Sequence, residues 1–139
     1  MIKLNFDNKL GIFYECFVGS FSIGDMVSHY NSGCSNNNLP ERLNIIVDYT
    51  KAKFTFEIDD LHEIVGVIKK NIEYYEYVKA VMLHATPYEQ VLSMMFQDLA
   101  ENIPNFHTKI FTTKEAATKW ILSDKVKDIK KKELIENGV

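Results

Sequence analysis

The chain of 139 residues is long enough for one folded domain with its own core, and too short for two of ordinary size. Hydrophobic residues make up 46% of it and charged residues 25%, which is typical of a globular protein and excludes an intrinsically disordered one. The formal net charge is −3, and Arg42 is the only arginine among 16 cationic residues. A nucleic-acid partner is therefore not expected, because phosphate recognition needs a concentrated basic surface.

The cysteines and the N-terminal segment indicate the cellular compartment. Cys16 and Cys34 do not form a CxxC pair and have no histidine at ligand spacing, so we expect neither a zinc site nor a redox motif. Residues 1–7 lack the continuous apolar stretch of a signal peptide, and no later segment is apolar enough to span a bilayer. These features predict a cytoplasmic protein without membrane insertion, metal or cofactor.

The first elements in chain order are a β-hairpin and a short helix. Residues 2–6 alternate apolar and polar, residues 7–9 have turn chemistry, and residues 11–18 form a largely apolar run, which together predict the hairpin. Ser22 begins a helix to about residue 30, with Asp25 placed to complete a capping box. Glycine, asparagines and proline in residues 31–42 predict the longest loop.

The middle of the chain predicts two strands separated by a helix. Residues 43–49 are β-branched and nearly continuously apolar, as expected for a central strand of a parallel sheet that is covered on both faces. Apolar residues at three- and four-residue spacing from residue 61 to residue 75 predict an amphipathic helix. Residues 78–85 then predict a second buried strand.

Two further helices are predicted from capping sequences. Thr86, Pro87 and Glu89 combine a capping box with proline at the first helical position, which predicts a helix to residue 102. Residues 108–111 predict a strand, and Thr112 with Glu115 predicts a capping box for a last helix. The order ββαβαβαβα indicates an α/β fold, with helices packed on a mixed, mostly parallel sheet. Residues 1–122 form the predicted domain, and the charged residues 123–139 a helical extension or tail.

Several short motifs together resemble the SpoIIAA-like family, which is related to STAS domains and to the lipid-binding lobe of Sec14-type proteins. These motifs are the hairpin start, the strand ending in Val47-Asp48-Tyr49, Thr86-Pro87 opening a helix, and IFTTKEAATKWI at residues 110–121. The resemblance implies the STAS (SpoIIAA-like) fold. Anti-sigma-factor antagonists of the STAS group carry an Asp-Ser-Ser-Gly-like turn with a serine phosphorylation switch after the central strand. Residues 54–61, FTFEIDDL, contain neither serine nor glycine, so we expect the switch to be absent.

A ligand crevice is predicted at the carboxyl ends of the strands, where open parallel sheets bind their ligands. The sequence places Asp48, Tyr49, His84 and Thr86 there. Asp48 and His84 would form an acid–base pair if their side chains came within hydrogen-bond reach. No nucleophile elbow, glycine-rich phosphate loop or HExxH motif accompanies them, so no catalytic residue is predicted and a structural role for His84 is favoured.

The helix predicted from residue 87 carries more apolar surface than one buried stripe needs. Val91 and Met94 widen its apolar arc to about 200°, against about 100° for an ordinary surface helix. Val91, Met94 and Met95, together with Tyr88, are therefore the predicted interaction surface, for self-association or for a protein partner. The alternative is that the C-terminal segment or a wide contact with the sheet covers this surface.

The sequence predicts a non-enzymatic STAS-like regulatory or interaction module that binds an unknown protein partner or a second copy of itself. Two alternatives stay open. A carrier of a small apolar ligand or lipid is implied by the relation to Sec14-type proteins, and a small enzyme would use His84 and Asp48.

Overall fold

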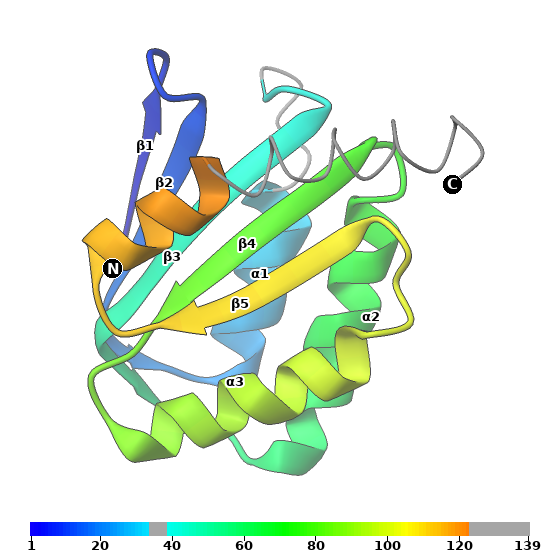
Figure 1. Ribbon diagram of the computed structural model, residues 1–139. Coiled ribbons are helices and arrows are strands. Elements are labelled where there is room, and N and C mark those ends of the chain that lie inside the picture. The colour runs from blue at the N-terminus through cyan, green and yellow to red at the C-terminus, as the bar shows by residue number, and fades with distance from the viewer. Residues whose placement is uncertain (34–38, 123–139) are drawn as a thin grey trace, which may run out of the picture.

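The computed structural model describes residues 1–33 and 39–122. In chain order the elements are β1 (Ile2–Asp7), β2 (Ile12–Phe21), α1 (Ile23–Gly33), β3 (Arg42–Phe54), the short 3-10 helix η1 (Ile58–Asp60), α2 (Leu61–Asn71), β4 (Tyr77–Leu83), α3 (Pro87–Ala100), β5 (Phe106–Phe111) and a last helical segment at residues 114–122 (Figure 1). This succession confirms the predicted order ββαβαβαβα. The predicted C-terminal extension, residues 123–139, lies outside the described residues.

The five strands form one sheet in the order β1-β2-β3-β4-β5, so β3 is central as predicted. β1 is antiparallel to β2, and all other neighbours are parallel. The register shifts once, because Cys16 pairs with Asp48 but Val18 pairs with Lys51. The extra residue is a β-bulge in β3. It allows Tyr49 and Ala52, three positions apart, to contribute to the same core cluster.

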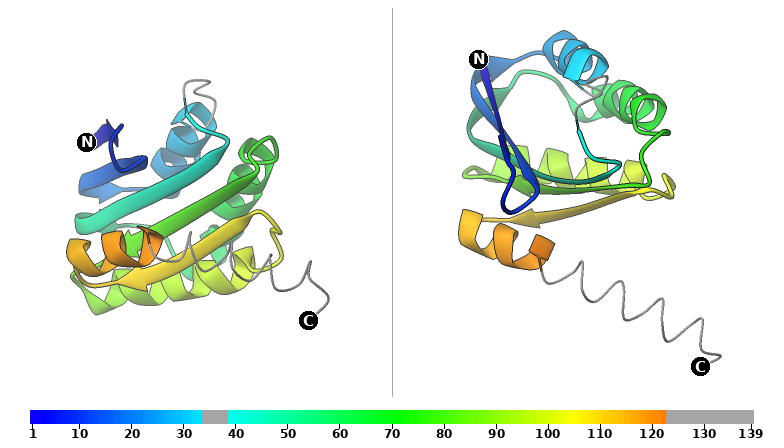
Figure 2. Two further views of the ribbon diagram at one scale, coloured as in Figure 1. Left: turned by 45° about the horizontal axis from the view of Figure 1, so that its top comes forward. Right: turned by 90° about the horizontal axis from the view of Figure 1, so that it is seen from above.

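Helices cover both faces of the sheet. α1, α2 and α3 lie on one face and residues 114–122 on the other, as Figure 2 shows from above. Because side chains alternate along a strand, Val47 and Tyr49 of β3 join the core under the three helices, whereas Ile46 packs on Ala117 and Ile121 of the last helix. Because helices cover both faces of the sheet at β3, residues pointing to either face are apolar, and the sequence of this strand is nearly continuously apolar.

Two strands and α1 are longer than the sequence predicted. β2 continues to Phe21 and β3 to Phe54, and these two buried residues pair with each other across the sheet. In β3 the exposed Lys51 and Lys53 alternate with the buried Ala52 and Phe54, so the end of this strand does not show in the sequence as an apolar run. α1 continues to Gly33, so the predicted loop of residues 31–42 is shorter, and its residues 34–38 lie outside the described residues.

One of the three predicted capping boxes forms at α1. The Ser22 backbone N donates to Asp25 Oδ2 at 2.9 Å, and the Asp25 backbone N donates to Ser22 Oγ at 3.1 Å. The box predicted at α3 was wrong, because Thr86 makes no side-chain cap bond. Glu89 is instead buried and accepts a hydrogen bond from the Phe54 backbone N at 3.4 Å.

The last helix is capped one residue later than predicted. The Ala116 backbone N donates to Thr113 Oγ1 at 3.2 Å, so Thr113 and not Thr112 is the cap. Glu115 then stands one position too early for a capping box. None of the helices in the described parts of the chain has the length and apolar character needed to cross a membrane.

Candidate functional site

The four residues of the predicted crevice differ in their exposure and in the face of the sheet toward which they point. Tyr49 and His84 are buried, with ring centroids 5.2 Å apart, whereas Asp48 is half-buried and Thr86 is exposed. Asp48 pairs with Leu83, which belongs to the core under the last helix. Alternation along the chain therefore directs Asp48 toward that face and His84, the residue directly after β4, toward Tyr49 and the face that α1, α2 and α3 cover.

Asp48 and His84 are not joined as an acid–base pair. Asp48 Oδ1 accepts hydrogen bonds from the Thr50 backbone N at 2.8 Å and from its hydroxyl at 2.6 Å. Within residues 1–33 and 39–122, neither ring nitrogen of His84 has a hydrogen-bond partner. Burial lowers the pKa of His84 to about 4, and the negative charge of Asp48 opposes this shift only in part. At neutral pH His84 is thus an uncharged ring packed in the core.

The predicted interaction surface lies open on α3. Tyr88, Val91, Met94 and Met95 are 52%, 49%, 51% and 38% exposed, and we call these four residues the α3 face. At 100° per residue they span an arc of about 120°. The sheet does not cover this face, because α3 turns Leu92, Phe96 and Ala100 into the core instead. The other predicted cover, the C-terminal segment, lies outside the described residues.

The α3 face carries no charged side chain. α3 contains no lysine or arginine, and Glu89 is buried. The first exposed charge in line with the face is Asp98, one turn beyond Met94. Tyr88 donates its hydroxyl to the Phe56 carbonyl at 3.0 Å, which fixes the ring at the start of the helix. The α3 face is therefore uncharged and mainly apolar, and the Tyr88 ring is held in place at its N-terminal end.

A buried polar cluster under α1 was not predicted. His29 Nε2 of α1 lies 2.7 Å from Glu15 Oε2 of β2, and the hydroxyls of Tyr30 and Tyr49 lie 2.9 Å apart. Burial raises the pKa of Tyr49, the hydrogen bond with Tyr30 opposes the rise, and the negative charge of Glu15 adds to it. The one signal in the sequence was Glu15 itself, a charged residue in an apolar strand, which needs a buried partner.

A cavity lies beside this polar cluster. It measures about 70 Å³ between the sheet and the three helices, and its lining includes Glu15, Tyr30 and Tyr49 but not Asp48, His84 or Thr86. In the described parts of the chain, no three or more histidine, cysteine, aspartate or glutamate side chains gather where they could hold a metal ion. This cavity therefore lies on the face of the sheet that α1, α2 and α3 cover.

The comparisons with known proteins concern the fold. No protein-family model matches the chain. No curated protein sequence matches it either. Its structure is similar to that of an uncharacterized protein of the DUF3478 family, with a SpoIIAA-like fold, from Shewanella loihica PV-4. The two chains are 15% identical, the TM-score is 0.55, and the match covers 87% of this chain and 92% of that one.

A second solved structure is that of the anti-sigma factor antagonist SpoIIAA in its unphosphorylated form. It is 10% identical with a TM-score of 0.49, and the match covers 86% of this chain and 96% of that one. The likeness to the Shewanella protein shows that this chain has a SpoIIAA-like fold, which confirms the fold that the sequence motifs implied. At this level of identity the likeness concerns fold and not activity.

Proposed function

We propose that this chain is a non-enzymatic SpoIIAA-like interaction module that associates with a second copy of itself through the α3 face. The observation that carries this proposal is the exposure of four neighbouring uncharged side chains, three of them apolar, on one helix. Methionine side chains adapt to a partner surface, and tyrosine is enriched at interfaces because it combines a large ring with a polar tip. Exposed apolar surface of this kind marks interaction sites.

The uncharged α3 face permits a second copy as the occupant. Two copies of a chain with a net charge of −3 repel each other, and they approach at least cost through a surface without charge. A two-fold axis brings the same patch of both copies together. Antiparallel packing centred between Val91 and Met94 leaves the two Asp98 carboxylates at opposite ends of the contact.

The expected association is weak. One strip of a 14-residue helix offers less than the roughly 800 Å² per partner of a standard stable interface. Interfaces below standard size are typical of transient complexes, so we expect a dissociation constant in the micromolar range and a dimer that forms and separates with concentration. This behaviour suits a regulatory module better than a permanent assembly.

We also propose that association does not depend on a phosphoserine after the central strand. The segment that follows β3 contains no serine, and its Asp60 accepts a hydrogen bond from the Glu57 backbone N at 2.9 Å. This hydrogen bond closes the turn that leads into η1 and α2, so Asp60 has a structural role. The segment therefore supplies a fixed connection between β3 and α2.

Substitution of Met94 by glutamate tests the proposed contact. We expect wild-type protein to show a mass that rises toward twice the monomer mass as its concentration increases through the micromolar range. Met94→Glu places two carboxylates near the axis of the contact and is expected to weaken association at least about tenfold. Sedimentation velocity of both proteins over the same concentrations measures this change.

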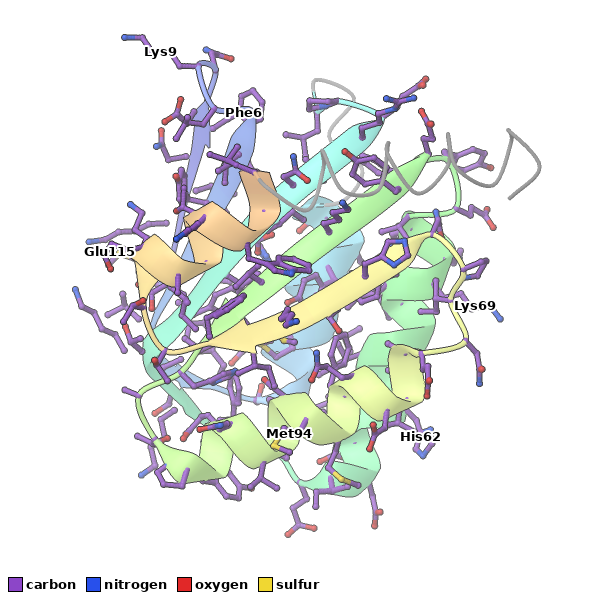
Figure 3. All side chains as sticks on the ribbon, in the orientation of Figure 1. Phe6, Lys9, His62, Lys69, Met94 and Glu115 are labelled. Atoms are coloured by element: carbon purple, nitrogen blue, oxygen red, sulfur yellow. The ribbon has the colours of Figure 1, made fainter. Side chains whose placement is uncertain are left out.

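Leu10→Glu is the matched control. Leu10 is 42% exposed in the turn between β1 and β2, and Figure 3 shows its neighbour Lys9 at the opposite end of the molecule from Met94. The control should associate like the wild type. A wild-type protein that stays monomeric throughout, or a loss of association in the control as large as in Met94→Glu, would remove the α3 face as the contact.

A further inference from the structure

The face of the sheet under the last helix carries a row of polar side chains next to its apolar cluster. Ile46 of β3 and Val81 of β4 belong to the cluster on which the last helix packs. Two residues earlier in the strands, and side by side across β3, β4 and β5, are Asn44, Lys79 and His107. Because alternate side chains of a strand point to the same face, these three residues share the face of Ile46 and Val81. We call them the polar row.

The polar row is buried at its centre. Lys79 is 2% exposed and Asn44 is 3% exposed. The Lys79 ammonium lies over the Tyr77 ring, 5.3 Å from its centroid. Within residues 1–33 and 39–122, Asn44 Oδ1 has no hydrogen-bond partner. A buried ammonium needs an anion close by, and an apolar cover would leave a buried amide oxygen unsatisfied. The polar row therefore requires a cover that is polar and brings negative charge.

The chain itself leads toward the polar row. Residues 114–122, orange in Figure 1, begin beyond the C-terminal end of β5 and run back toward the N-terminal ends of β3 and β4. Ile121, near the end of this segment, belongs to the same cluster as Ile46 and Val81. The polar row lies two residues, about 7 Å, farther toward the strand N-termini. The residues that follow Leu122 are therefore the nearest candidates to cover it.

These residues carry negative charge at the matching positions. In the helical extension predicted from the sequence, Asp124 and Asp128 fall within an arc of about 60° that also includes Ala117 and Ile121. Ala117 and Ile121 are fully buried against the sheet. At the rise of an α-helix, Asp124 and Asp128 stand about 5 Å and about 11 Å beyond Ile121, on either side of the spacing to the polar row. The stripe that faces the sheet thus changes from apolar to acidic where the sheet changes from apolar to cationic.

We propose that residues 123–139 dock on the polar row, with the Asp124 and Asp128 carboxylates beside the buried Lys79 ammonium. The last helix and α3 lie on opposite faces of the sheet (Figure 2). A segment docked on the polar row cannot also cover the α3 face, so the surface proposed for self-association stays open. The docking lies within one chain and does not depend on that association.

NMR signals of isotope-labelled full-length protein test where the segment lies. Asp124→Asn/Asp128→Asn removes both carboxylates and should shift the Asn44 side-chain amide and the Lys79 backbone amide. Glu133→Gln/Glu136→Gln is the matched control, because it removes two negative charges at least about 60° outside the arc that faces the sheet. The control should leave both signals in place.

Urea unfolding tests the pairing with Lys79. Asp124→Asn/Asp128→Asn takes the carboxylates away from a buried ammonium, so the urea midpoint should fall further than in the control. In the Lys79→Met background the same substitutions should lower the midpoint no more than the control does, because no ammonium is left to pair. If Lys79→Met does not fold, the NMR comparison decides.

Four results would overturn the docking. The acidic double variant could leave the signals of the polar row unmoved, or the control could shift them as strongly. An equal fall of the urea midpoint with and without Lys79 would exclude the ion pair. Shifts at Val91 and Met94 in place of the polar row would put the segment on the α3 face. Polar-row signals that change with protein concentration would assign the cover to a second copy.

Discussion

Replacing His29 by leucine is expected to lower the free energy of unfolding by about 3 kcal/mol. The reason is that Glu15 is only 6% exposed, so its carboxylate loses its 2.7 Å contact with His29 Nε2 and gains no water in return. Glu15→Leu is expected to cost less, because the His29 side chain left behind is 12% exposed, against 7% for Glu15, and so has more access to solvent. The order of the two effects follows from which partner is more deeply buried.

The double variant Glu15→Leu/His29→Leu completes the test. Two leucines remove both polar groups together, and such apolar replacements are often close to neutral, so this protein should be within about 1 kcal/mol of the wild type. Urea unfolding followed by circular dichroism measures all four proteins at one pH. A His29→Leu protein as stable as the wild type would show that the Glu15 carboxylate finds other partners.

His84 is expected to make the protein less stable in mild acid. Its pKa is lowered from 6.5 to about 4 in the folded chain, chiefly by burial. Between these two pH values the unfolded chain binds a proton that the folded chain does not, so stability is full above pH 6.5 and falls as the pH drops toward 4. The accumulated loss is up to about 3 kcal/mol.

His84→Phe isolates this contribution. Phenylalanine keeps a ring against Tyr49 and has no nitrogen to protonate. The wild type and the variant share all other titrating groups, so the difference between their unfolding free energies should change by up to about 3 kcal/mol between pH 7 and pH 4, in favour of the variant at the lower pH. Parallel pH profiles for the two proteins would mean that His84 is protonated as easily in the folded chain as in the unfolded one.

The order of the elements was predictable because apolar periodicity reports burial directly. Residues 43–49 were continuously apolar because β3 is central and packs on helices at both faces. The surplus apolar arc of α3 predicted the exposed positions Val91 and Met94 for a similar reason, since one helix buries only one stripe. In both cases the pattern depends on the element itself and not on a distant partner.

Tertiary partners could not be read from the same patterns. Glu89 stands at the right position for a capping box, yet the end of β3 presents the Phe54 backbone N, and the side chain turns inward. Local spacing contains no information about that neighbour, which is 35 residues away. Tyr49 and His84 of the predicted crevice show the same limit, because local spacing did not indicate that their rings pack on each other in the core.

The buried pair of Glu15 and His29 is a second case in which a tertiary partner could not be predicted from the sequence. A glutamate in an apolar strand indicates that its carboxyl group needs a buried partner, but several residues of α1 could have been that partner. His29 is the partner because α1 is rotated so that this side chain faces Glu15. Packing of Met26 and Tyr30 against the core sets that rotation. The sequence therefore carried a signal that Glu15 needs a partner, which was not used, and no signal for His29 as that partner.

Charge complementation at Met94 tests self-association through the α3 face most directly. Met94→Glu and Met94→Lys should each be largely monomeric at concentrations where the wild type dimerises, because like charges meet near the two-fold axis. An equimolar mixture of the two should regain the dimer mass in sedimentation, since opposite charges then face each other. A mixture that remains monomeric beside a dimeric wild type, or single variants that dimerise as tightly as the wild type, would contradict a contact at this face.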